Sequence, residues 1–170
     1  MIFHEGDAIS GKQAYAKITI NGRVEELFYA KSLEATIEKN KVDVPVLGRT
    51  NTPKRAAGWS GSGTLTIYYV TSMFRKLMLE YIQQGRDFYF DLYVVNNDPQ
   101  SSAGRQAVTL KNCNLDSVVI AKFDASSDDM LEEELPFTFS GVELHEEFKE
   151  ITGQTTSEKT GETTDKNTGA

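Results

Sequence analysis

The stretch GWSGSGTLTIYYVTSMFRKLMLEYIQQG, residues 58–85, places a strand pattern directly before a helix pattern. The first three glycines, at positions 58, 61 and 63, indicate a pliable segment that leads into a strand. The β-branched and aromatic run TLTIYYV, residues 64–70, is typical of that strand. Ser72 then precedes apolar residues at helical spacing, and Gly85 stands where helices often end. We therefore predict one α-helix, about residues 72–84, whose apolar stripe packs as the single cover on a β body.

Strand patterns surround this helix on both sides. Asn21-Gly22 favours a type I′ turn between strands at about residues 13–20 and 24–30, the second continuing through residues 32–40. Further strands are predicted at residues 87–95, as a pair around residues 112–114, and in two segments after residue 130. The fold class is mainly β (α+β): an antiparallel β-sandwich or barrel-like domain over residues 1–148 with one helix.

The composition limits the kinds of molecule that we expect the protein to bind. The chain has 170 residues, a net charge of −7 and one cysteine, Cys113. An acidic protein does not gather nucleic acid through its overall field, and a lone cysteine suits a reducing compartment. The amino-terminal residues lack a signal-peptide pattern, and no stretch is apolar enough to span a membrane, so we expect no membrane partner and a cytoplasmic site of synthesis.

A basic segment interrupts this acidic chain. Residues 39–57 hold five basic residues against Asp43 alone, a net charge of +4, and contain two prolines. We predict a long loop that contacts a neighbouring subunit. The alternative is a solvated insertion that packs on its own domain. The residues expected at the subunit interface are apolar or basic: Val42, Val44, Val46, Leu47, Arg49, Lys54 and Arg55.

The carboxyl-terminal segment has a different composition. The runs TGQTTSEK and TGETTDKN repeat imperfectly over eight residues and contain hardly any apolar side chain. Such a segment buries too little surface to offset the entropy of ordering. We predict a disordered Thr/Gly-rich tail over residues 149–170.

No catalytic constellation is evident. The two histidines, His4 and His145, have no partners at metal-ligand spacing, and nothing near Cys113 would activate its thiol. We expect no catalytic residue, no metal and no cofactor, and predict that the protein is not an enzyme.

The order of these elements resembles the tail tube proteins of contractile-tailed phages and phage-like particles of Gram-positive bacteria. The glycine-rich lead into LTIYYVTS, the following helix, the NDP loop at residues 97–99 and PFTF at residues 136–139 carry the resemblance, which covers about residues 10–147. It implies a β-sandwich or barrel-like subunit of homohexameric rings, stacked into a conduit through which DNA passes without specific binding.

The resemblance also implies partners and a place. These are tail sheath, baseplate initiator and tape measure proteins, with assembly in the host bacterial cytoplasm and a final location in the virion tail. Two alternatives stay open: the inner tube of a phage-tail-like bacteriocin or secretion particle, and, from another class, a small-ligand-binding β-barrel whose aromatic residues line a cavity.

Strand alternation identifies a candidate surface for the tube lumen. In the segment after residue 130, Glu132 and Glu134 alternate with Leu131, Glu133 and Leu135 and so point away from the apolar face. Glu34 and Glu38 alternate likewise with apolar residues. We predict that Glu132 and Glu134 line the lumen and repel phosphate. The alternative is an ordinary solvated strand face.

Overall fold

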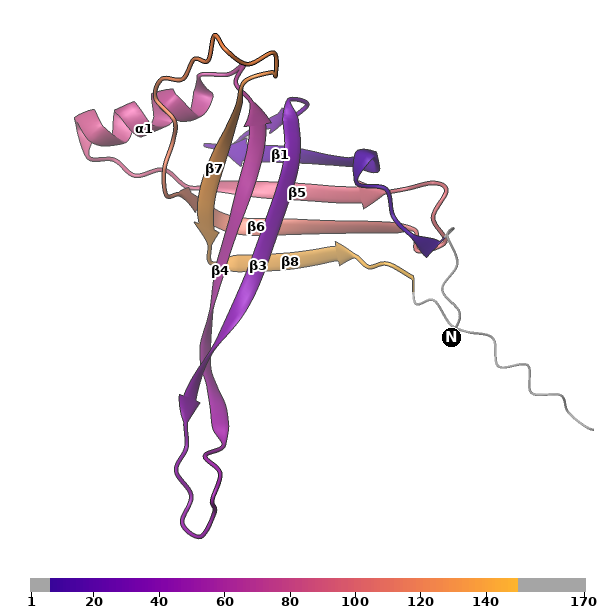
Figure 1. Cartoon of the computed structure of the whole chain (residues 1–170), viewed down its shortest axis with the longest axis vertical. Helices are drawn as coiled ribbons and strands as arrows, with labels where there is room; N and C mark the ends of the chain where they lie inside the picture. The colour runs from indigo at the N-terminus through magenta and orange to yellow at the C-terminus, as the bar shows by residue number, and fades with distance from the viewer. Residues whose placement is uncertain (1–6, 150–170) are drawn as a thin grey trace, which may run out of the picture.

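The computed structural model of the chain describes residues 7–149. Its strands form two layers whose strand directions cross at a steep angle (Figure 1). All strand pairs are antiparallel, in the order β2-β1-β5-β6-β7-β4-β3, with β8 added beside β6. The predicted antiparallel β-sandwich with one helix is confirmed. The bounds are: 3-10 turn Gly11–Gln13, β1 Ala14–Ile20, β2 Arg23–Glu26, β3 Ala30–Asp43, β4 Lys54–Tyr68, α1 Met73–Gln84, β5 Phe90–Asn97, β6 Arg105–Leu115, β7 Glu132–Phe139, β8 Gly141–Glu146.

One bent strand joins the layers. β6 pairs with β5 and β8 along most of its length and with β7 at its end, at Asn114 and Leu115. A bulge before that end contains Asn112 at φ 53°, whose N–H donates to Asp91 Oδ1 over 3.0 Å. The prediction of two strands around residues 112–114 is therefore wrong, because the bulge turns one continuous strand from layer to layer.

Aromatic rings fill the space between the layers. Phe74, Phe90, Phe137 and Phe139 form a continuous row with successive ring centroids 6.5, 6.5 and 6.3 Å apart. All four are buried, and aliphatic side chains from both layers surround them. Because these rings come from α1, β5 and β7, the core ties the helix to both layers.

Two glycines in β4 make room for this core. Gly61 pairs with Phe139 and Gly63 with Phe137. A Cβ on Gly63 would lie 2.6 Å from both Phe137 Cζ and the Glu34 carbonyl oxygen, and one on Gly61 would collide with the Phe139 ring. These glycines are therefore part of a strand, where the absent side chains let two phenylalanine rings lie on the backbone. The prediction of a pliable lead is wrong.

The helix ends as predicted but packs less completely. Gly85 has φ 67°, and its N–H donates to the Tyr81 carbonyl over 2.8 Å, which closes α1. Only Phe74 is fully buried in α1, whereas 45% of Tyr81 and 67% of Ile82 are exposed. The expected apolar stripe covers the core through the first half of the helix only.

The first hairpin is as predicted, but the strand after it is shorter. Asn21 and Gly22 have φ of 51° and 79°, as a type I′ turn requires. The following strand stops at Glu26 because Leu27 turns into the core, with its N–H donating to the Ala16 carbonyl over 2.9 Å. β3 then begins in the other layer, which corrects the predicted continuous strand over residues 24–40. The predicted tail lies outside the described residues except for Lys149.

Candidate assembly surfaces

β3 and β4 continue beyond the sandwich as a two-stranded arm, residues 38–60 (Figure 1). β7 accompanies β4 only from Gly61 to Tyr68. Past Gly61 the two arm strands pair with each other as far as Asp43 and Lys54. The predicted loop over residues 39–57 is thus confined to residues 44–53, because the strand ladder ends just before the first proline and resumes just after the second.

The seven predicted interface residues all lie on this arm and are all exposed. Val42, Lys54 and Arg55 belong to its strands, and the other four lie in its loop. Leu47 at the tip is fully exposed, at 103%, and Val42, Val44 and Val46 are 38–50% exposed. Among the described residues, the buried core contains none of residues 38–60, although the Trp59 ring at the base of the arm lies 6.3 Å from the ring of Phe139. The contact of the arm with a neighbouring subunit stays a prediction.

The charges of the arm are mostly unneutralised. Lys54 Nζ lies 3.7 Å from Asp43 Oδ1, and both side chains are well exposed. Within residues 7–149, Arg49 and Arg55 form no ion pair. An exposed apolar tip with free positive charges behind it is suited to an acidic, partly apolar partner surface.

The outer face of the β3, β4 and β7 layer is rich in hydroxyl groups and carboxylates. Strand register places Glu134 opposite Thr66, and Thr64 between Glu34 and Pro136. The hydroxyl-bearing and acidic side chains on this face, which it shares with Tyr68 and Pro136, are Ser32, Glu34, Thr36, Glu38, Ser60, Ser62, Thr64, Thr66, Glu132, Glu134 and Thr138. Glu132 and Glu134 are therefore on one face with Glu34 and Glu38, as alternation indicated.

The two glutamates predicted for the lumen differ in their surroundings. Glu134 is exposed, whereas Glu132 Oε1 is 2.5 Å from Lys31 Nζ and is half-buried. This hydrogen bond raises the pKa of Lys31. The unpaired Glu134 thus carries more of the free negative charge of this face.

The opposite face of β7 contains a buried ion pair that the sequence alone did not reveal. Glu133 is fully buried among apolar side chains, and Arg75 Nη1 lies 3.0 Å from its Oε1. Burial raises the pKa of Glu133, and the nearby Arg75 opposes that shift. The Arg75 guanidinium also lies 4.1 Å from the centre of the Tyr69 ring. A glutamate at an apolar position of an alternating strand was the available signal for such a partner.

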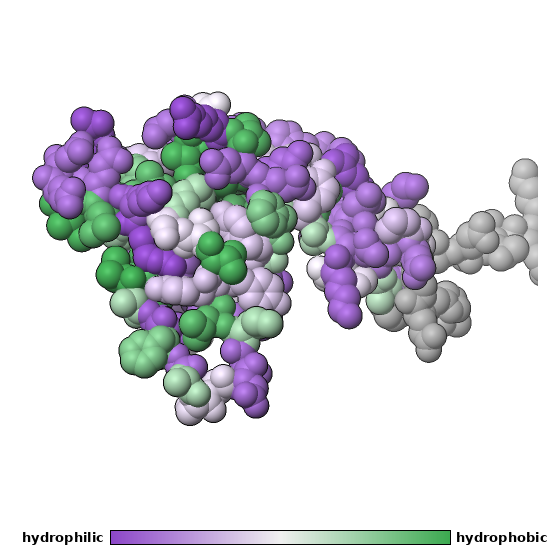
Figure 2. Space-filling view, turned by 90° about the horizontal axis from the view of Figure 1, so that it is seen from above, coloured by the Kyte–Doolittle hydropathy of each residue, from purple (hydrophilic) through white to green (hydrophobic). Residues whose placement is uncertain are grey.

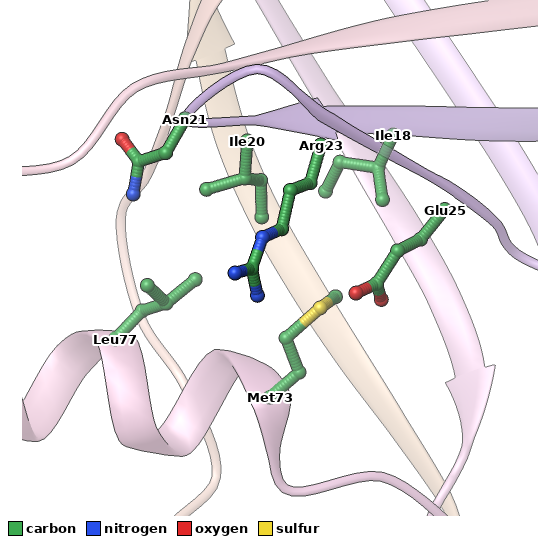
Figure 3. A pocket seen from close by; sticks show the side chains of 7 residues that line it. All are labelled: Ile18, Ile20, Asn21, Arg23, Glu25, Met73 and Leu77. Carbon is green, nitrogen blue, oxygen red and sulfur yellow. The ribbon is translucent and has the colours of Figure 1, made fainter.

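A surface cleft of about 400 Å³ separates the β1–β2 hairpin from α1. Figure 3 shows Arg23 and Glu25 extending from β2 toward Met73 and Leu77 of α1. This cleft is open to solvent, whereas the space between the layers is filled by phenylalanine rings. The enclosed aromatic cavity expected of a ligand-binding barrel is therefore not the arrangement seen in residues 7–149. Within that range, no helix has the length and apolar character needed to cross a membrane.

A filled sandwich with an exposed, partly apolar arm and a charged sheet face has the features expected of a structural subunit that binds other protein chains. The chain belongs to the phage tail tube protein family, whose model matches residues 1–146. It is a tail tube subunit of a phage or phage-like particle.

Two curated proteins and one solved structure are similar to this chain. Phage-like element PBSX protein XkdM of Bacillus subtilis (strain 168) is 41% identical over 144 residues, covering 85% of this chain and 95% of the relative. Uncharacterized protein YqbM of the same strain is 41% identical over 143 residues, covering 84% and 94%. A chain of the sheath-tube complex of an extracellular contractile injection system, PVC, has the same fold, with a TM-score of 0.62 and 16% identity over 81% of this chain and 90% of that chain.

Proposed function

We propose that this tail tube subunit forms hexameric rings that stack into a conduit for DNA ejection, and that the arm bridges subunits of successive rings. The observation that carries the proposal is an arm that, past Gly61, has no third strand beside it and contributes no buried residue to the core among the described residues. A two-stranded hairpin alone is marginally stable in water, so a neighbour is needed to hold it. The sheath, baseplate initiator and tape measure proteins are the proposed further partners, with assembly in the host cytoplasm before incorporation into the tail.

The arm is tested by replacing Lys41–Ala57 with a short Gly-Ser linker. The monomer should keep its melting temperature, because the removed residues lie outside the core. Polymerisation at high protein concentration, followed by sedimentation and electron microscopy, should be abolished. Normal tubes from the linker variant would contradict the proposal.

We also propose that Glu132 and Glu134 line the lumen. Six subunits would repeat each charge around the bore and keep phosphates off the wall. Changing both residues to lysine should slow or stall DNA ejection from intact particles. Changing the exposed β2 residues Glu25 and Glu26 to lysine is the matched control, since it alters the net charge equally at another surface. Unchanged ejection from intact particles that carry the Glu132 and Glu134 changes would show that this face does not line the lumen.

The inner tube of a phage-tail-like bacteriocin is a second candidate, because such a tube would use the same subunit surfaces. The similarity to a protein of the phage-like element PBSX supports this second candidate. Capsid and terminase genes beside the gene for this chain would support a complete phage, and their absence would support the bacteriocin.

A further inference from the structure

We propose that the exposed end of α1 in one copy packs on an apolar surface where the arm meets β8 in the next copy, so that these two surfaces join copies side by side within a ring. The inference rests on the proposed hexameric ring and identifies surfaces that close it. It is carried by two uncovered apolar surfaces on opposite sides of the chain and by the charges beside them.

The second half of α1 carries apolar side chains that its own chain leaves uncovered. Tyr81 and Ile82 are exposed, as are Leu79, one turn before Ile82, and Tyr89, which follows the helix. Figure 2 shows apolar side chains in green beside hydrophilic ones in purple at the left edge of the molecule, where α1 lies. An apolar stripe that runs past the core it covers is available to a further chain.

The base of the arm has a second uncovered apolar surface. Strand register puts Ile37 beside Gly61 and Trp59 beside Lys39, on the same side of the layer as the buried Leu65. Ile37 and Trp59 are nevertheless about half exposed. The core-facing side of β3 and β4 therefore continues beyond the part that the other layer covers.

β8 extends this surface at an angle to the arm. Val142 pairs with the buried Leu110, so Val142 and Leu144 face the core side of their layer, although both are exposed. Phe139 connects the two parts, because its ring lies 6.3 Å from that of Trp59 and β8 begins two residues after it. We call Ile37, Trp59, Val142 and Leu144 the junction surface.

The two surfaces are placed for a contact between neighbours. Figure 1 shows α1 on the left of the sandwich, and β8 running to the right from the point where the arm descends. A contact between two different surfaces of the same chain is heterologous, and when it is repeated by rotation it closes into a ring. The end of α1 in each copy would then cover the junction surface of the next.

The charge beside the junction surface is positive. Lys39 and Lys41 follow Ile37 on the same side of β3. Within residues 7–149, neither lysine forms an ion pair. The neighbouring Lys54 and Asp43 are paired with each other over 3.7 Å and leave this excess unchanged.

The charge beside the end of α1 is negative. Glu80 and Arg86 lie 3.8 Å apart and offset each other. The Asp87 carboxylate accepts two hydrogen bonds of 2.9 Å from the neutral Asn114 amide and, among the described residues, forms no ion pair. Opposite charges beside two apolar surfaces favour their contact.

The connection between β6 and β7 is a less suitable surface for α1. It exposes Ile120, Phe123 and Met130, but residues 116–131 contain four aspartates against one lysine. This excess of negative charge would face Asp87 of the neighbour. The junction surface is therefore the apolar surface whose electrostatics favour α1.

Cross-linking of the concentrated full-length chain tests the contact. The only native cysteine, Cys113, is buried, and burial raises its pKa to about 12, so it stays unreactive. The double variant Ile82→Cys, Leu144→Cys, treated with a short bismaleimide, should give a ladder on denaturing gels that ends at six chains. Val24→Cys with Leu144→Cys is the matched control, with two exposed cysteines, and should give no ladder.

The outcomes separate this inference from the proposed function. Hexameric rings in electron micrographs without a ladder from the Ile82→Cys, Leu144→Cys variant, or a ladder from the control, would overturn the assigned surfaces and leave the ring. A ladder that runs past six chains would support the contact but overturn the hexamer of the proposed function.

Shortening the apolar side chains provides an independent test. Ile82→Ser or Leu144→Ser should each raise the chain concentration at which half of the protein is in rings by about tenfold, because each removes apolar surface from the contact. The melting temperature of the monomer should stay unchanged, since both side chains are exposed. Val24→Ser on β2 is the control and should assemble normally. Sedimentation velocity measures assembly, and rings at the wild-type concentration from both serine variants would overturn the inference.

Discussion

The inner and outer halves of the β3–β4 hairpin use the same two strands in opposite ways. In the inner half, β4 lies between β3 and β7, and its residues Leu65 and Ile67 are fully buried. In the outer half, residues 38–43 pair with residues 54–60 and no third strand joins them. One continuous ladder thus changes from a component of the core into a projection.

The difference separates residues that stabilise the fold by burial from residues that are left exposed. The inner half is stabilised by burial, which contributes about 1.5–3 kcal/mol for each fully buried large apolar side chain. The outer half has its own hydrogen bonds, the contact of Trp59 with the Phe139 ring at its base, and the exposed Asp43–Lys54 pair. Such surface ion pairs contribute about 0–1 kcal/mol. The arm therefore adds little to the stability of the monomer, and its exposed valines and Leu47 are free to contact another chain, as we propose.

The largest expected effect is the difference between what the two halves of the hairpin contribute to the free energy of unfolding. Phe137→Ala removes a fully buried ring that lies on Gly63 and should lower the free energy of unfolding by about 3–5 kcal/mol. Leu47→Ala at the exposed arm tip should change it by less than about 0.5 kcal/mol. Urea denaturation measures both. Similar losses from the two substitutions would show that the arm folds into the body in solution.

The second prediction compares the buried Arg75–Glu133 ion pair with the exposed Lys54–Asp43 pair. Arg75→Met leaves the Glu133 carboxylate buried without its partner and should cost about 3 kcal/mol or more. Lys54→Met breaks the 3.7 Å pair of the arm and should cost no more than about 0.5 kcal/mol. Denaturation at neutral pH checks both values. Equal, small costs would mean that water reaches Glu133.

Local patterns predicted the elements that are stabilised locally. The Asn21-Gly22 turn requires positive φ at two consecutive residues, and the helix ends at a glycine with φ 67°. The alternation that ends at Phe139 likewise identified a strand with a buried face and placed Glu132 and Glu134 together on the other face. Each of these features depends on residues that are close in sequence.

The missed features depend on residues that are far apart. Gly61 and Gly63 indicated a flexible lead when taken alone, and only their pairing with Phe139 and Phe137 explains them as strand residues. The nearby prolines predict a loop for residues 41–43, although the ladder with β4 holds these residues in a strand. The spacing of two glycines against two phenylalanines, each pair two residues apart, was the signal that could have joined them.

A smaller effect concerns how the stability of the sandwich depends on pH through the buried Glu133. Burial raises the pKa of Glu133 in the folded state, so its contribution to stability is present below pH 4.5, the ordinary pKa of glutamate, and is lost as pH rises through the folded-state value. Relative to Glu133→Gln, the wild-type chain should therefore lose stability as pH rises above 4.5.

Asp98 provides the control of opposite sign. Backbone hydrogen bonds from Ser10 and Gln100 lower the pKa of Asp98, so its contribution is present above the ordinary value of 3.8 and is lost as pH falls through the folded-state value. Relative to Asp98→Asn, the wild-type chain should lose stability on acidification. Thermal unfolding at a series of pH values measures both differences. The same sign for the two variants would contradict the assigned causes.

The smallest effect is expected at the carboxyl-terminal end of the body. The Lys149 N–H donates to the Ala103 carbonyl over 2.8 Å, and the Lys149 side chain lies 3.6 Å from the position of a Cβ on Gly104. Ending the chain after Lys149 should leave the melting temperature and polymerisation unchanged, because residues 150–170 are almost devoid of apolar side chains. Ending it after Phe148 also removes that hydrogen bond and should cost about 0.5–1.5 kcal/mol, a shift in melting temperature of about 1–6 °C. Comparing the two truncations isolates Lys149 because the rest of the tail is absent from both. A lower melting temperature already in the longer truncation would mean that residues 150–170 pack on the body, and the predicted disordered tail would be wrong.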